Sequence, residues 1–130
     1  MSAINAVEQY GAALAAGDMA AFEALLAPQI VWHQPGTNPL SGDHVGPAAV
    51  LAHLGSFMVL SGGTFALATD SATEAGDLVS TTVTFSAQRP DGRTLSQRGV
   101  DVFRIEGAHI AEIWLMSEDQ EAEDRFWGTA

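Results

Sequence analysis

The feature that most constrains the fold is a change of pattern at residue 64. From there to residue 117 the chain consists of four segments rich in Thr, Val, Ile and Phe, a composition typical of strands. The four segments are residues 64–71, 78–88, 94–105 and 109–117. The connections between them are short and turn-like, so they predict an antiparallel meander. Strands of about ten residues are long for their class, and they must twist and coil.

The first part of the chain has helical signals instead. Ile4, Val7 and Leu14 recur at helix spacing before Gly17, and Asp18 can cap a second helix over about 18–27. A short strand over 30–33, a loop over 34–46 and a third helix from residue 47 to the glycines at 62–63 follow. This order predicts an α+β fold in one domain, residues 1–130, with a cone-shaped, mixed but mostly antiparallel sheet curved around three N-terminal helices. Such a cone leaves a cavity at its wide end unless the helices fill it.

Composition narrows the range of partners. The chain has 16 acidic and 5 basic residues, a formal net charge of -11. Nucleic acids and anionic membranes select basic patches, so neither is expected as a partner. The first residues hold no secretion signal and no stretch approaches the ~20 apolar residues of a membrane span, so we expect a cytoplasmic protein. The chain has no cysteine, which excludes disulfides and thiolate metal sites. The acidic run 118–124 is interpreted as a solvated helix face.

Three separated residues are candidates for one catalytic site: Tyr10, His33 and Asp101. Asp101 interrupts an apolar strand, where a carboxyl is costly unless it is hydrogen-bonded or lines a cavity. Alternation puts Gln97, Asp101 and Phe103 on one face of that strand and two arginines on the other, so we expect Asp101 to face inward. An imidazole, a phenol and a carboxyl around an apolar cavity suit proton transfer. The alternatives are a structural histidine, a core tyrosine and an ion pair of Asp101 with an arginine.

Further side chains are candidate substrate contacts. They are Trp32, His44, Phe57, Phe85, Gln97, Phe103 and Trp114. We expect His44 at the lip of the pocket and His53 facing solvent, while Trp114 could instead be a core or interface aromatic. A metal site built from His33, Asp43 and His44 matches no specific ligand spacing, so we expect neither a metal nor a cofactor.

Four motifs carry a resemblance to a known family. They are residues 9–18 (QYGAALAAGD), 41–46 (SGDHVG), 100–107 (VDVFRIEG) and 110–114 (IAEIW). In this order, over about residues 4–128, they resemble the nuclear transport factor 2-like superfamily, and more closely its SnoaL-like polyketide cyclase and ketosteroid isomerase branch. The resemblance implies a cystatin-like roll around an apolar cavity, and a homodimer formed through the outer face of the sheet.

The resemblance also implies roles for the candidate residues. In the isomerases, a tyrosine on the first helix and a protonated aspartic acid on the late strand hold an enolate oxygen, and Tyr10 and Asp101 stand at the matching places. The isomerase base is an aspartate in the segment that here reads WHQPG, residues 32–36, where His33 takes its position. The cyclases use an aspartate at the Asp101 position and a histidine on the preceding strand, which this chain lacks. The superfamily's epoxide hydrolases need an Asp–Arg–Asp group, but alternation puts Arg98 and Asp101 on opposite faces.

The leading hypothesis is cofactor-independent acid/base catalysis, of isomerase or cyclase type, on a small apolar carbonyl compound. His33 would remove a proton beside the carbonyl, while Tyr10 and Asp101 donate hydrogen bonds to the enolate oxygen. The roles could be exchanged, with an ionised Asp101 as the base. One alternative is a non-catalytic small-ligand-binding or dimerisation module, which a cavity closed by aromatic side chains would favour. Another is an epoxide hydrolase- or dehydratase-like enzyme in which His33 and Asp101 activate water.

Overall fold

A computed structural model describes residues 2–128 as four helices and a single six-stranded sheet. The helices are α1 (Ala3–Ala16), α2 (Met19–Ala24), α3 (Pro47–Leu60) and α4 (Gln120–Trp127). The strands are β1 (Leu26–Gln34), β2 (Gly42–Val45), β3 (Ala66–Ala75), β4 (Leu78–Gln88), β5 (Thr94–Glu106) and β6 (His109–Ser117). Their order in the sheet is β2-β1-β6-β5-β4-β3, and only the β1–β6 pair is parallel. None of the helices in this part of the chain is long and apolar enough to cross a membrane.

The helix ends follow from local chemistry that the sequence already contains. Gly17 ends α1 in the left-handed conformation, with φ of 68°, which costs glycine little. The Asp18 carboxylate then caps α2 by accepting a hydrogen bond from the amide of Ala21. Pro47 occupies the first turn of α3, where its missing N–H is not needed. These predicted boundaries are confirmed.

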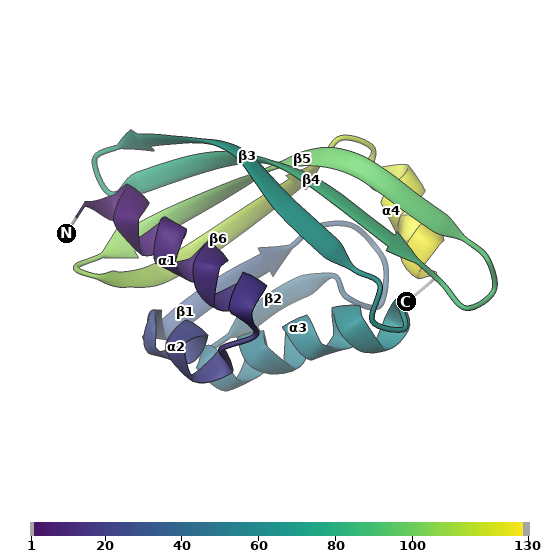
Figure 1. Ribbon diagram of the computed structural model, residues 1–130, viewed down its shortest axis with the longest axis horizontal. Helices are drawn as coiled ribbons and strands as arrows, with labels where there is room; N and C mark the ends of the chain where they lie inside the picture. The colour runs from purple at the N-terminus through teal and green to yellow at the C-terminus, as the bar shows by residue number, and fades with distance from the viewer. Residues whose placement is uncertain (1, 129–130) are drawn as a thin grey trace.

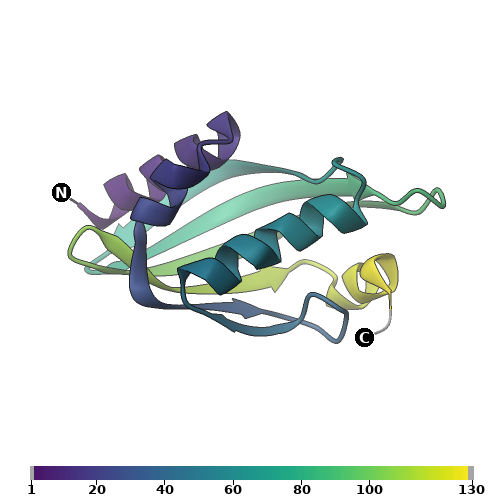
Figure 2. The ribbon, with the colours of Figure 1, turned by 90° about the horizontal axis from the view of Figure 1, so that it is seen from below.

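The sheet arches over the helices, as Figures 1 and 2 show, with α1, α2 and α3 on its concave side. Helix α4 lies at one end of the sheet, beside the end of α3 (Figure 2). Strand β4 shows which face is inside, because its odd-numbered residues from Val79 to Ala87 are buried and the Ser and Thr residues between them are exposed. The predicted α+β class, with a curved and mostly antiparallel mixed sheet, is confirmed.

The buried side chains form two clusters under the arch. The first, which we name the α1-side core, includes Val7, Tyr10, Phe22, Ile30 and Phe103. The second, the α4-side core, includes Phe57, Val83, Phe85, Phe126 and Trp127. The two cores divide the concave side between the N-terminal helices and the C-terminal helix.

Four predicted boundaries differ from the structure. Helix α2 ends at Ala24, before the predicted end, and β1 already begins at Leu26, so Pro28 lies in a strand and not at a helix end. The predicted loop 34–46 contains β2, an edge strand that pairs with β1. Strand β3 runs to Ala75, beyond the predicted residue 71. These elements depend on partners distant in sequence, which local patterns do not encode.

Candidate functional site

Asp101 faces the concave side of the sheet, as predicted from alternation along β5. It is 8% exposed, while its neighbours Val100 and Val102 point to the outer face and are half-buried. Within residues 2–128, no group donates a hydrogen bond to its carboxyl oxygens; only its backbone carbonyl is engaged, by the Thr81 hydroxyl at 3.3 Å. A buried carboxyl without a partner is rare, because its desolvation is not compensated. Asp101 is therefore the first functional candidate.

Gly99 makes room on the same face, two residues before Asp101. A Cβ at this position would lie 2.7 Å from the carbonyl oxygen of Met116 and 3.2 Å from the ring of Phe85. Real side chains do not approach a backbone oxygen so closely, so the position requires glycine. The absent side chain lets the Phe85 ring pack against the backbone of Gly99.

The space that Asp101 reaches is a small cavity of about 30 Å³, enough for roughly one or two water molecules. Apolar residues form most of its wall, and polar groups come from four positions. The lining residues are Gln34, Phe57, Phe65, Leu67, Val83, Phe85, Asp101, Leu115, Met116, Ser117 and Glu123. Of the predicted contacts, Phe57 and Phe85 therefore line the cavity together with Asp101. The cavity reaches the acid, but its small volume leaves little room for a ligand.

The surroundings keep Asp101 protonated over a wide pH range. Burial, and to a smaller degree the negative charge of Glu123, raises the pKa of Asp101 from 3.8 to about 7. Desolvation acts in this direction because the charged form loses the most on leaving water. A carboxyl that titrates near neutrality can both donate and accept a proton at physiological pH.

Glu123 is a second acid at this cavity, and the sequence analysis missed it. It is only 3% exposed, although it belongs to the acidic run that we interpreted as solvated. Its carboxylate accepts hydrogen bonds from the Ser117 hydroxyl at 2.6 Å, the Gln120 amide at 3.2 Å and the Trp127 indole at 3.3 Å. The solvated-face interpretation is thus wrong for Glu123. Its position three and four residues before Phe126 and Trp127 places it on the apolar side of α4.

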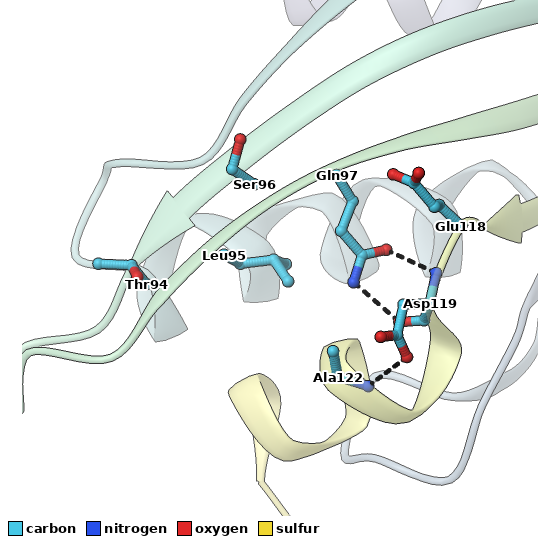
Figure 3. Close-up of a pocket in the computed structure, with 7 residues that line it drawn as sticks. All are labelled: Thr94, Leu95, Ser96, Gln97, Glu118, Asp119 and Ala122. Atoms are coloured by element: carbon cyan, nitrogen blue, oxygen red, sulfur yellow. Dashed lines mark hydrogen bonds between the residues drawn. The ribbon is translucent and has the colours of Figure 1, made fainter.

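Helix α4 is fixed at its N-terminus by Gln97, as Figure 3 shows. The Gln97 side chain donates to the carbonyl of Asp119 at 2.8 Å and accepts from its amide at 3.2 Å, while the Asp119 carboxylate caps the helix at Ala122. These residues line an open surface depression of about 500 Å³. Gln97 does not line the Asp101 cavity, because its amide holds the helix instead.

His33 lies on the opposite face of the sheet from Asp101, so the prediction that it points into the cavity is wrong. Its Nδ1 is 2.8 Å from Asp43 and its Nε2 is 2.6 Å from Glu112, with 30% of the side chain exposed. Its ring stacks on Trp114 at 5.6 Å, so Trp114 also lies on the outer face and is not a cavity contact. Burial lowers the His33 pKa, but the hydrogen bonds to Glu112 and Asp43 outweigh this and raise it overall.

Within residues 32–36, the side chain that faces the cavity is that of Gln34, one position after His33 in β1. Its side-chain oxygen lies 2.9 Å from the Trp32 indole nitrogen and 2.9 Å from Nε2 of His53. Trp32 is therefore a buried anchor for Gln34 and not part of the cavity wall. His53 is 3% exposed, against the expectation that it faces solvent. His44 is half-buried and stacks on His53 with 3.8 Å between ring centroids, away from the cavity lining.

Tyr10 belongs to the α1-side core. Its ring contacts Phe22 and Phe103, each at 5.2 Å between centroids, and neither Tyr10 nor Phe103 lines the cavity. Burial raises the pKa of Tyr10, and the charge of Asp101 adds to this, so its hydroxyl stays protonated. The structure thus brings Tyr10 within electrostatic range of Asp101 and separates both from His33.

Two alternative sites are not assembled among the described residues. The Arg98 side chain is 78% exposed and pairs with Glu118 at 3.5 Å, so no Asp–Arg–Asp group forms around Asp101. His33 and Asp43 do meet, but His44 turns toward the carbonyl of Leu40 at 3.1 Å, and no cluster of three metal-binding side chains is found over residues 2–128.

Comparison with known proteins agrees with this architecture. The sequence profile of the SnoaL-like domain matches residues 7–113. The chain belongs to the SnoaL-like domain family. No curated protein shows significant sequence similarity to it.

Solved structures share the fold of this chain. A protein of unknown function with a cystatin-like fold from Xanthomonas campestris is 43% identical, with a TM-score of 0.91 over 98% of this chain and 99% of that one. A nuclear transport factor 2-like protein of unknown function from Burkholderia pseudomallei is 22% identical, with a TM-score of 0.86 over 99% and 100%. IdmH, a candidate polyketide cyclase from Streptomyces antibioticus, is 18% identical, with a TM-score of 0.74 over 91% and 93%. The last two likenesses show the fold only, and the predicted family and cystatin-like roll are confirmed.

Proposed function

We propose that this SnoaL-like protein is a cofactor-independent acid/base enzyme, of isomerase or cyclase type, in which Asp101 moves a proton on a small, largely apolar carbonyl compound. The observation that carries the proposal is the buried Asp101 carboxyl, which faces a small cavity without a hydrogen-bond partner among the described residues and has a pKa raised to about 7. Groups with these properties are concentrated at catalytic sites.

In the proposed reaction Asp101 acts first as base and then as acid. The ionised carboxylate removes a proton from the carbon beside the carbonyl, and the electron pair of that C–H bond moves into the carbonyl to give an enolate. Return of the proton from Asp101 to a different carbon completes an isomerisation. Attack of the enolate carbon on a second carbonyl of the same molecule, followed by protonation of the new alkoxide, completes a cyclisation.

The composition and the cavity wall support this type of chemistry. The five basic residues are all arginines, so no lysine side chain can activate a carbonyl as a Schiff base. The rings of Phe57, Phe65 and Phe85 favour an apolar ligand. The position of His33 on the outer face supports the exchanged assignment, in which Asp101 is the base.

Exchange of hydrogen for deuterium tests the proposal without knowledge of the natural substrate. Cyclohex-2-enone is incubated with the protein in D₂O, and loss of the signals of its acidic hydrogens is followed by proton NMR. The wild-type protein should accelerate the loss over buffer, and Asp101→Asn should abolish the acceleration. His33→Asn is the matched control and should exchange at the wild-type rate. Equal exchange by wild type and Asp101→Asn would refute the catalytic role.

A non-catalytic ligand-binding module is the second candidate, and the narrowness of the cavity favours it. A volume of about 30 Å³ is too small for a ring compound unless side chains such as Phe65 and Leu67 move. This candidate predicts that cyclohex-2-enone raises the melting temperature without any exchange in wild-type protein.

We also propose a homodimer through the outer face of the sheet. Four apolar side chains gather there on the central strands β5 and β6, in the cross-strand pairs Val100–Met116 and Val102–Trp114, and Met116 is 53% exposed. A second copy of the chain would bury this patch. Val100→Glu should then lower the mass measured by sedimentation, whereas Val59→Glu on the exposed side of α3 should not. A wild-type protein that sediments as a monomer would contradict the proposal.

A further inference from the structure

The orientation of the Gln34 side-chain amide is determined by its two neighbours. An indole nitrogen can only donate a hydrogen bond, so the Gln34 atom 2.9 Å from Trp32 Nε1 must be the amide oxygen. The same oxygen lies 2.9 Å from Nε2 of His53, so this nitrogen must carry a proton and donate as well. Both donors are buried, Trp32 at 4% and His53 at 3% exposure, which holds the amide in one orientation.

His53 suits this role because it is neutral. Burial, together with the charge of His44, lowers the pKa of His53 to about 3. The neutral ring has one donor nitrogen and one acceptor nitrogen, and the bond to Gln34 selects Nε2 as the donor. The arrangement is therefore stable across the physiological pH range.

The amide nitrogen of Gln34 is left as a free donor. No described residue accepts a hydrogen bond from it, although Gln34 is only 7% exposed. Over residues 2–128, the only fully enclosed side-chain nitrogen or oxygen without a partner is Nε of Arg89, so the Gln34 amide nitrogen must border open space. Gln34 is one of the residues that line the Asp101 cavity, so this cavity is the open space available to its free N–H group.

Strand register places this donor in line with Asp101. In β5 and β6, Asp101 lies opposite Leu115. In β1 and β6, His33 lies opposite Trp114 in parallel, and continuing that register by one residue puts Gln34 opposite Leu115. Gln34, Leu115 and Asp101 thus form one row across three neighbouring strands, with Leu115 as the floor of the cavity between the two polar groups.

We infer that Gln34 binds the carbonyl oxygen of the ligand through its amide nitrogen, and so selects neutral compounds with a hydrogen-bond acceptor. The inference rests on the proposed function for the identity of the site, and it adds the group that orients the carbonyl toward Asp101. The same N–H group would strengthen its bond as negative charge develops on the oxygen during enolate formation. Two buried donors already saturate the amide oxygen, so Gln34 itself offers a ligand only its N–H donor.

The test compares two ligands of similar shape, benzaldehyde and toluene, by NMR titration. Benzaldehyde has an acceptor but no enolisable hydrogen, so its binding is independent of catalysis. Wild-type protein should bind benzaldehyde about fivefold more tightly than toluene, the value of one neutral hydrogen bond. Gln34→Met should reduce this ratio to about one while leaving toluene binding unchanged. The matched control Gln97→Met removes a buried glutamine outside the cavity and should keep the ratio.

A second variant covers the case in which Gln34→Met does not fold. Gln34→Glu can still accept from Trp32 and His53, but it presents an acceptor oxygen to the cavity, so it should lose the preference for benzaldehyde. A preference that survives in either folded variant, or its absence from wild type, would overturn the inference. Failure of deuterium exchange with an intact benzaldehyde preference would refute the proposed catalysis alone.

Discussion

Replacing Asp101 by asparagine should stabilise the fold, and the gain should grow with pH. The pKa of Asp101 is about 7 in the folded chain against an ordinary value of 3.8. Between these values the folded state retains a proton that the unfolded state has released, so wild-type stability falls as the pH rises. The difference of about three pKa units corresponds to about 4 kcal/mol, at ~1.36 kcal/mol per unit. Asparagine has nearly the same shape and carries no charge, so it does not incur this cost.

Urea unfolding followed by tryptophan fluorescence measures the effect. The free energy of unfolding of Asp101→Asn relative to wild type should be small near pH 4 and should increase by about 4 kcal/mol by about pH 8. Asp91→Asn is the control with the opposite sign, because the hydrogen bond from Arg93 lowers the pKa of the exposed Asp91. That variant should be less stable than wild type by an amount that is constant above about pH 5. If the difference in the free energy of unfolding between Asp101→Asn and wild type stays constant from about pH 4 to about pH 8, burial does not raise the pKa of Asp101.

Three further predictions use the same assays. Glu123→Gln removes the negative charge beside Asp101, so the pKa of Asp101 should fall and the pH dependence of deuterium exchange should move to lower pH; an unmoved midpoint would show that the two acids do not interact. Gly99→Ala should cost about 1–3 kcal/mol in urea unfolding, since its Cβ would lie 2.7 Å from the Met116 carbonyl oxygen, and wild-type stability would contradict this contact. His33→Asn should be less stable than wild type below about pH 6.5, and the deficit should shrink at higher pH because a raised histidine pKa stabilises only where the ring is protonated. A deficit that instead grows toward high pH would contradict the ion pairs of His33.

The sequence predicted the parts of the fold that local chemistry determines. Gly17 and Asp18 separate two helices through a left-handed residue and a cap, and Pro47 begins α3; each acts within a few residues. The four long strands were also predictable, since their turns are short. Strand β2 was not, because nothing within Gly42–Val45 signals a strand apart from its pairing with β1.

The site was predictable only in part, because its geometry also depends on packing between segments that are distant in sequence. Side chains alternate along β5, and the arginines on one face indicated that the other face is the inner one. Asp101 was therefore placed correctly on the inner face. In β1, packing against the helices decides which residues face inward. The prediction placed His33 on the inner face, whereas the structure has Gln34 there. A better signal was present, because Ile30, Trp32 and Gln34 alternate with Val31 and His33, and the first set has the larger apolar side chains.

Helix periodicity could have found two of the missed residues. His53 lies three residues after Val50 and four before Phe57, which places it on the buried side of α3. In α4, Glu123 lies three residues before Phe126 and four before Trp127, which places it on the buried side of that helix. Their polar character led to the solvent-facing interpretation, whereas the structure satisfies both with buried partners.

The proposed function depends on Asp101 titrating near neutrality inside the fold. The direct measurement is a titration of its side-chain carboxyl carbon by ¹³C NMR, with the signal assigned from its absence in Asp101→Asn. We expect a midpoint of about 7. A midpoint near the ordinary aspartate value of ~3.9 would contradict it, because Asp101 would then be ionised throughout the physiological range and could not act as an acid.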